Sequence, residues 1–165
     1  MTVENTDPRF PWLTNWVETL LSQLWYPCTV GAISANCREL MEVWADAEEE
    51  ATGKSPINLD YKLHDFGVRG ASSMESAALG GAAHLMNFKG TDNVPALLML
   101  RKFYGADMPG ESIAASEHST ITSWGRENEA VAMENMLTSY ASDATIACVS
   151  DSYDINNACS KIVGS

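Results

Sequence analysis

The sequence predicts an α/β fold in which parallel strands alternate with helices. From residue 61 onward, an apolar strand-like run ends in a polar motif and is followed by a helical pattern, and this happens four times. Alternating strands and helices form parallel sheets that are covered by helices. Ligands bind such sheets at the carboxyl ends of the strands, where the polar motifs lie. Four units make half of an eightfold barrel, and they could equally form an open sheet.

The chain before these units is predicted to be mainly helical. Residues 2–6 are expected to form a strand that turns at Asp7 and Pro8. After Pro27, a helix is expected to run through residues 40–44 into an acidic stretch, with a loop at 53–56. Between these segments, a core-facing helix is predicted from apolar residues at helical spacing: Trp12, Leu13, Trp16, Val17, Leu20, Leu21 and Leu24.

The first strand–helix unit has the most distinctive motif. Its strand is predicted at residues 61–66, and its helix is predicted to begin at Ser72 with a capping box to Glu75. Gly80 and Gly81 lie inside that helix, where each glycine costs about 1 kcal/mol relative to alanine. We therefore expect close helix packing at these two glycines.

The three later units follow the same order. The second helix accommodates Pro95 in its first turn, where proline is tolerated. The third helix carries Met133, Met136, Leu137 and Tyr140 at helical spacing. A helix is also expected behind the fourth strand. The three strands are predicted near residues 84–88, 112–116 and 144–149.

Composition excludes several classes of protein. Ten Lys+Arg against 22 Asp+Glu give a net charge of −12, which argues against a partner that is a nucleic acid or an anionic membrane. No apolar run approaches the ~20 residues of a membrane-spanning helix, and the first five residues lack the features of a signal peptide. The four cysteines form no C-x-x-C pair and no zinc-ligand pattern with histidine. We expect a cytoplasmic protein with buried or half-buried reduced thiols and no protein-held metal.

His118 is the best candidate for chemistry. It follows the third strand, and Asp151 lies at the corresponding end of the fourth. If these strands are neighbours, the carboxylate can hold one imidazole nitrogen while the other faces a substrate. A structural histidine in a loop is the alternative.

Three side chains after the first two strands are candidates for ligand binding. Phe66 could stack on a planar ring or belong to the core. Arg69 offers a planar donor fork for phosphate or carboxylate, or makes a surface ion pair. Asp92 could accept hydrogen bonds from an amide or cap the helix that follows. No P-loop, dinucleotide fingerprint or nucleophile elbow is present.

Five motifs together resemble the nicotinamide phosphoribosyltransferase family. The resemblance covers nearly the whole chain and implies that residues 57–165 are the first half of a type II phosphoribosyltransferase (β/α) barrel. Residues 1–56 would belong to a neighbouring N-terminal α/β domain. The motifs lie at residues 2–8, 61–67, 87–92, 117–122 and 150–154.

The family joins nicotinamide to 5-phosphoribosyl 1-diphosphate, giving nicotinamide mononucleotide and diphosphate in NAD salvage. The resemblance implies a homodimer with sites at the subunit interface, Mg²⁺ that accompanies the diphosphate, and ATP as a coupled substrate. It also implies a base pocket. Phe66 would stack on the pyridine ring and Arg69 would lie near the ring and the phosphate. Asp92 would accept from the carboxamide and repel nicotinate, Ser112 would line the pocket, and His64 would sit at its mouth.

The same resemblance assigns chemistry to the histidine pair. His118 would be phosphorylated when ATP hydrolysis is coupled to the reaction, and Asp151 would orient it. Val68 and Ala147 stand where vertebrate members have tyrosine and serine, so the pocket differs there.

Members of this family are much longer than this chain. It is expected to be an internal segment that lacks an upstream aromatic wall and downstream phosphate-binding motifs, and to be inactive alone. Two other functions stay open. One is nicotinate phosphoribosyltransferase, and the other is a non-catalytic fragment or half of a split enzyme that needs a C-terminal partner.

Overall fold

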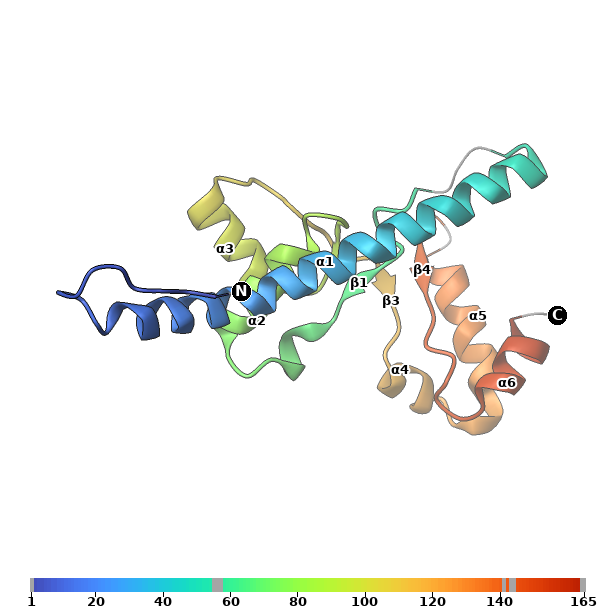
Figure 1. The fold of residues 1–165 in the computed structure, drawn as a ribbon. Helices are drawn as coiled ribbons and strands as arrows, with labels where there is room; N and C mark the ends of the chain where they lie inside the picture. The colour runs from blue at the N-terminus through green and yellow to red at the C-terminus, as the bar shows by residue number, and fades with distance from the viewer. Residues whose placement is uncertain (1, 55–57, 141, 143–144, 164–165) are drawn as a thin grey trace. The chain divides into compact units, whose positions relative to one another are not determined.

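The computed structural model describes residues 2–54, 58–140, 142 and 145–163. The chain forms two compact units, a first unit at Met1–Glu111 and a second unit at Ser112–Ser165. Each unit combines helices with a two-stranded parallel sheet (Figure 1). The predicted mixture of helices and parallel strands is confirmed. The predicted domain boundary after residue 56 stays a prediction.

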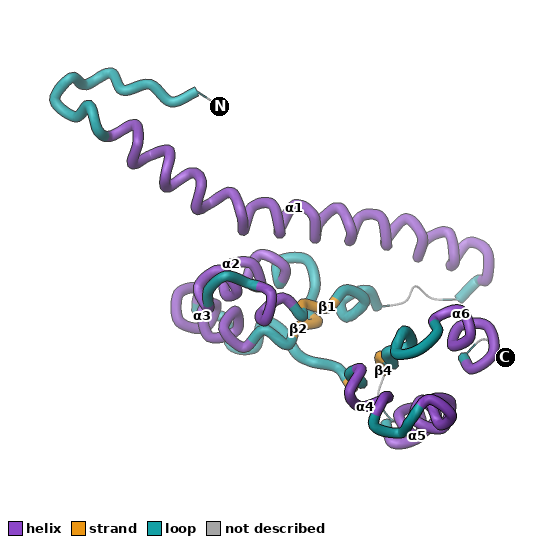
Figure 2. The backbone as a smooth tube through the Cα atoms, turned by 90° about the horizontal axis from the view of Figure 1, so that it is seen from below, coloured by secondary structure: helices purple, strands orange, loops and turns teal. Residues whose placement is uncertain are grey.

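A single helix, α1 (Leu13–Thr52), occupies most of the N-terminal part, as both backbone views show (Figures 1 and 2). The prediction of two helices that meet at Pro27 is wrong, because Pro27 lies inside this continuous helix. The predicted strand at residues 2–6 is also absent from the described residues. Instead, the Asn5 side chain donates to the carbonyl oxygens of Asp7 and Phe10. These local side-chain bonds satisfy backbone groups that would otherwise pair with a neighbouring strand.

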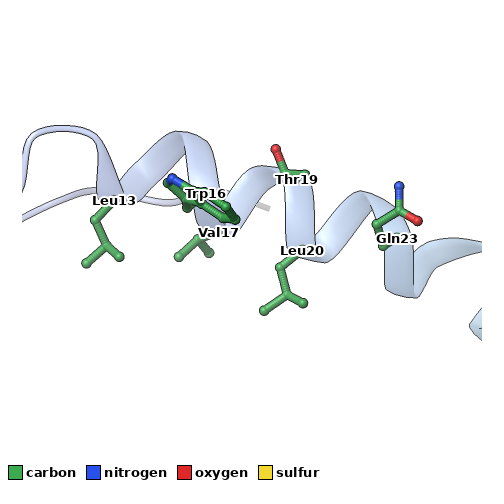
Figure 3. A pocket seen from close by; sticks show the side chains of 6 residues that line it. All are labelled: Leu13, Trp16, Val17, Thr19, Leu20 and Gln23. Carbon is green, nitrogen blue, oxygen red and sulfur yellow. The ribbon is translucent and has the colours of Figure 1, made fainter.

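Both ends of α1 are largely exposed, and its buried residues lie between them. Ser34 and Ala45 are buried. The N-terminal end is exposed, and 68% of Trp16 is accessible to solvent. Figure 3 shows Leu13, Val17 and Leu20 on one side of the helix. The prediction that this apolar face lies in the core is therefore wrong for the described chain.

The first unit holds a short parallel sheet. Strands β1 (His64–Asp65) and β2 (Gly90–Thr91) pair in register, first residue with first residue. A 3-10 turn, η1 (Gly67–Gly70), follows β1. Helix α2 (Met74–His84) comes next, and α3 (Val94–Tyr104) follows β2.

Two boundaries in this unit differ from the predictions. The predicted strand near 84–88 is wrong, because alanine-rich α2 extends to His84 and β2 begins only at Gly90. The cap of α2 is Ser73 instead of Ser72, since Ser73 Oγ accepts from the Ser76 backbone N–H at 3.0 Å.

Close packing explains the two adjacent glycines of α2, as predicted. A β-carbon added at Gly80 would lie 2.5 Å from the hydroxyl oxygen of Tyr26 on α1. One added at Gly81 would lie 2.7 Å from Ala96 Cβ on α3. The missing side chains therefore let α1 and α3 approach α2 closely.

The second unit repeats the parallel pairing. Strands β3 (Ala114–Ala115) and β4 (Ile146–Ala147) pair in register, so the predicted strands are present but short. Ala144, where the last strand was expected to begin, lies outside the described residues. Helix α5 (Glu129–Ser139) confirms the predicted methionine-rich helix.

Shorter helices complete this unit. Its core contains Ile121, Ala132, Met133 and Ala158. All four cysteines are free, but Cys28 and Cys159 are exposed, so the expected burial is wrong for these two. The helices are α4 (His118–Thr122), η2 (Arg126–Asn128) and α6 (Ile155–Asn157), which continues as a π-helical turn, η3 (Ala158–Ile162). Within the described parts of the chain, no helix combines the length and the apolar character needed to cross a membrane.

An ionic cluster around Asp60 joins α1 to the segment before β2. Asp60 accepts from Lys89 Nζ at 2.9 Å and from Arg38 Nη1 at 3.0 Å, and Arg38 also pairs with Glu42 on α1. The Lys89 ammonium, with the Arg38 guanidinium, holds the pKa of the Asp60 carboxyl below its ordinary value.

This cluster predicts acid sensitivity. Because the pKa of Asp60 is lower in the folded state, its stabilisation is complete above the unfolded pKa near 3.8 and is lost as the pH falls through the folded pKa. We expect Asp60→Asn to lower the free energy of unfolding by about 1 kcal/mol at pH 7. Denaturant unfolding at pH values from 7 down to 2.5 measures the difference, which should shrink as the pH falls below 3.8. Asp46→Asn, an exposed control on α1, should have little effect; an equal loss there would contradict the assignment.

Candidate functional site

The predicted site residues fall into two groups, one in each unit. His64, Phe66, Arg69 and Asp92 belong to the first unit; His64 begins β1, and the other three follow the carboxyl ends of β1 and β2. Ser112, His118 and Asp151 belong to the second unit, around β3 and β4.

The parallel register brings two predicted binding residues to one edge of the first sheet. Asp65 faces Thr91 across the sheet, so Phe66 and Asp92 follow directly at neighbouring strand ends. The backbone N–H of Asp92 donates to the carbonyl oxygen of Asp65 at 3.1 Å. The chain then enters η1, which carries Arg69.

These residues line one cavity of about 290 Å³ formed by Phe66, Val68, Arg69 and Asp92. Phe66 is 56% exposed, so its alternative role as a core residue is wrong. The capping role considered for Asp92 is also wrong, because Asn93 caps α3. The cavity thus combines an aromatic ring, a guanidinium and a carboxylate, which suits a planar ligand that has hydrogen-bond donors.

His64 lies behind Phe66 and Asp92. Its ring stacks on Phe66 with centroids 4.7 Å apart, and its Nε2–H donates to Asp92 Oδ1 at 3.1 Å. The side chain is only 7% exposed. Nδ1 is buried without a hydrogen-bond partner among the described residues and lies against Gly90. His64 therefore supports the cavity wall, while its role at the pocket mouth stays a prediction.

Two residues that sequence reasoning did not assign hold this wall together. Asp65 Oδ1 accepts from the Gly67 backbone N–H, and Asp65 Oδ2 accepts from Asn93 Nδ2, both at 2.8 Å. A sequence signal existed for Asn93, since asparagine just before Val94-Pro95 is a common helix cap. Asp65 lies two residues before Gly67, the spacing of an Asx turn, but no local signal marks its bond to Asn93.

The histidine pair of the second unit forms as its spacing predicted. His118 Nε2 lies 2.9 Å from Asp151 Oδ1, and the two side chains are 65% and 63% exposed. The neighbouring strands account for this, because Ser116 donates its backbone N–H to Ala147 and accepts at Oγ from Val149. An exposed imidazole held by a carboxylate can accept or transfer a group at its other nitrogen.

The loop around His118 is ordered by a cap. Glu117 and Thr120 form a capping box at the start of α4, with the Glu117 backbone N–H donating to Thr120 Oγ1. Ser112 is exposed, and its hydroxyl donates to the Ile113 carbonyl at 3.4 Å. Its expected role in lining the base pocket stays a prediction.

Comparisons with known proteins identify relatives that cover both groups of residues. Residues 61–165 match the sequence model of the nicotinate phosphoribosyltransferase (NAPRTase) family. A protein of Xanthomonas campestris pv. campestris named nicotinamide phosphoribosyltransferase is 50% identical over 159 residues, which are 96% of this chain and 33% of that protein.

Two more distant relatives carry the same name. The Acinetobacter baylyi protein is 35% identical over 93% of this chain and 30% of its own length. The Mycoplasma genitalium protein is 35% identical over 98% of this chain and 33% of its own length. The chain therefore spans about a third of the length of the curated relatives that it matches.

Proposed function

Because the chain belongs to the nicotinate phosphoribosyltransferase family, we propose that it supplies the base pocket and the phosphohistidine of a nicotinamide phosphoribosyltransferase. That enzyme joins nicotinamide to 5-phosphoribosyl 1-diphosphate in NAD salvage and releases nicotinamide mononucleotide and diphosphate. The observation that carries the proposal is the single cavity lined by Phe66, Arg69 and Asp92. The relatives' names support this choice of substrate.

We propose that the two small parallel sheets belong to the first half of a type II phosphoribosyltransferase barrel. Residues 57–165 would supply four of its strand–helix units, and residues 1–56 would belong to the adjoining domain. The parallel pairing of β1 with β2 and of β3 with β4 supports this. So does the parallel bridge from Gly90 to Glu111.

In this proposal the pocket orients the base. Phe66 stacks on the pyridine ring, Asp92 accepts from the carboxamide NH₂, and Arg69 lies beside the ring and the phosphate. The ring nitrogen attacks the anomeric carbon, so a C–N bond forms. The C–O bond to diphosphate breaks, and its electron pair leaves with diphosphate. The protein contributes positioning and charge stabilisation to this transfer.

Asp92 favours nicotinamide over nicotinate. A carboxylate accepts from a carboxamide NH₂ but repels the carboxylate of nicotinate at the same distance. The description of the matched family as nicotinate phosphoribosyltransferase keeps the second base as a candidate. Turnover of the two bases by one protein distinguishes them.

The histidine pair would couple ATP to the reaction. An imidazole nitrogen of His118 attacks the γ-phosphorus, and ADP leaves with the electrons of the broken P–O bond. Asp151 accepts a hydrogen bond from Nε2, so the phosphoryl group would be carried by Nδ1. The carboxylate would stabilise the positive charge that the phosphorylated ring gains.

The remaining partners are part of the same proposal. They are 5-phosphoribosyl 1-diphosphate, ATP, a second subunit in a homodimer, and the regions of the relatives that lie outside this chain. Among the described residues, no group of three or more His, Cys, Asp or Glu side chains is placed to hold a metal ion. Mg²⁺ would therefore arrive with the diphosphate instead of being held by a cluster of these side chains. A cytoplasmic location is proposed as well.

A chimera tests the function. Replacing the matching third of the Xanthomonas campestris relative with this chain should retain synthesis of nicotinamide mononucleotide from nicotinamide, with much slower use of nicotinate. The chain alone, assayed in parallel, is expected to be inactive. A folded chimera that uses nicotinate in preference to nicotinamide would contradict the proposal, as would one that uses neither base.

Substitution of His118 should abolish phosphorylation, and substitution of Asp151 should slow it. In the chimera, we expect His118→Ala to remove acid-labile phosphate transferred from γ-labelled ATP, because the acceptor nitrogen is gone. Asp151→Asn should slow that transfer by about a hundredfold. Glu134→Gln on α5 is an exposed control. Full labelling of the His118→Ala protein would rule out His118 as the acceptor.

A further inference from the structure

We infer that Asp65 and Asn93 are a positioning pair for the base pocket, a role that rests on the proposed function. Neither residue lines the cavity formed by Phe66, Val68, Arg69 and Asp92. Both connect the elements that carry those lining residues.

Asn93 is the hub of the pair. It is only 1% exposed, and its backbone N–H, its backbone carbonyl and both polar atoms of its side chain all have hydrogen-bond partners. Nδ2 donates at 2.8 Å to both Asp65 Oδ2 and the Ala77 carbonyl, and Oδ1 accepts from the Ala96 backbone N–H at 3.1 Å. Its own backbone N–H donates to Thr91 Oγ1 at 2.9 Å. One buried amide therefore links β1, α2, β2 and α3.

Asp65 forms hydrogen bonds with residues on both sides of the cavity. Its backbone carbonyl accepts from the Asp92 N–H at 3.1 Å, and its Oδ1 accepts from the Gly67 N–H at 2.8 Å. Gly67 begins the turn that carries Arg69 and directly follows Phe66. The turn that follows Phe66 and the backbone of Asp92 are therefore both hydrogen-bonded to Asp65.

The space for the pair depends on Gly81. A β-carbon at this position would lie 2.8 Å from Asp65 Oδ2 and would also contact Asn93 Nδ2. The side-chain bond between Asp65 and Asn93 therefore needs a glycine in α2, which gives the second of the two adjacent glycines a role beyond helix packing.

The pair can be tested by exchanging its side chains in the 165-residue chain. Asn93→Asp keeps a good helix cap but places two carboxylates together. The double variant Asp65→Asn/Asn93→Asp restores a donor opposite an acceptor and keeps the wild-type net charge. Ser73→Ala is the matched control, because it removes the side-chain cap of α2, a helix of the same length, and Ser73 does not line the cavity.

Two readouts separate positioning from stability. Hydrogen exchange of the Gly67 amide in the 165-residue chain reports the loop, and titration of the same variants with nicotinamide, made in the chimera, reports the pocket. We expect Asn93→Asp to speed Gly67 exchange and to weaken nicotinamide binding, each about tenfold or more. The double variant should recover part of the slow Gly67 exchange and part of the nicotinamide affinity. Ser73→Ala should lower the melting temperature without changing the Gly67 exchange or the nicotinamide affinity.

Wild-type affinity for nicotinamide in folded Asn93→Asp would overturn the inference, as would a double variant that recovers neither readout. If Asn93→Asp does not fold, Asp65→Asn gives the same comparison, because an amide offers only one of the two acceptor oxygens that Asp65 uses. Failure of the wild-type chimera to bind nicotinamide would contradict the proposed function instead. In that case, the exchange rate of the Gly67 amide in Asn93→Asp, in the double variant and in Ser73→Ala would still show whether the bond between Asp65 and Asn93 orders the loop.

Discussion

Asp92→Ala is expected to weaken the use of nicotinamide by about a hundredfold while leaving the protein folded. The carboxylate lies at the cavity and carries the proposed contact with the carboxamide. Loss of a charge-assisted hydrogen bond costs about 1.5–3 kcal/mol, and each 1.4 kcal/mol corresponds to a factor of ten. Because Asn93 and not Asp92 caps α3, the helix keeps its cap in this variant.

Steady-state kinetics of the chimera measure this effect as kcat/KM for nicotinamide, together with the melting temperature. Asp92→Asn is the closer variant, since its side-chain oxygen can still accept from His64 Nε2. Asp107→Ala, an exposed aspartate elsewhere in the first unit, is the matched control. Unchanged kcat/KM in Asp92→Ala would remove Asp92 from the site, and an equal loss in Asp107→Ala would indicate a general charge effect.

Gly81→Ala is expected to be among the most destabilising single changes in the first unit. The added methyl group would lie 2.7 Å from Ala96 Cβ and 2.8 Å from Asp65 Oδ2, and it would also contact Asn93 Nδ2. These neighbours are a buried helix residue and two hydrogen-bonded side chains, so relief requires α2 and α3 to separate. Overpacking of this kind costs about 1–3 kcal/mol, and disruption of the buried Asn93 network adds to that cost.

Denaturant unfolding of the 165-residue chain measures the loss. Gly31→Ala on α1 is the matched control, because its added β-carbon would meet nothing closer than Ala83 Cβ at 3.7 Å. Alanine is favoured over glycine inside a helix by up to about 1 kcal/mol, so Gly31→Ala should be neutral or stabilising. Equal stability of the Gly81→Ala and Gly31→Ala proteins would contradict the packing described for α2.

Local patterns in the sequence predict several elements well. The helix with Met133 and Met136 follows from apolar residues at helical spacing, and α3 follows from a proline in a first turn. The strands are harder, because an extended apolar run becomes a strand only where a partner pairs with it. Each described strand is accordingly only two residues long.

Some features of the candidate site could be predicted from the sequence, and others could not. The pairing of His118 with Asp151 could be predicted, because residues that follow adjacent parallel strands meet at one edge of a sheet. The position of His64 behind Phe66 could not, since it depends on a ring stack and on close contact with Gly90. The exposure of Trp16 was also unpredictable, because helical periodicity marks an apolar face but does not supply the surface that would cover it.

The sequence by itself determined the family of this protein, the order of strands and helices from residue 61 onward, and the residue types at the strand ends. These features depend on neighbours in the chain or on short motifs. Only the tertiary structure decided that α1 is continuous through Pro27 and that Asn93 donates a side-chain hydrogen bond to Asp65 beside the cavity of Phe66 and Asp92. The physical reason is that buried hydrogen bonds between residues 28 positions apart depend on how helices and strands pack, and no local pattern encodes that packing.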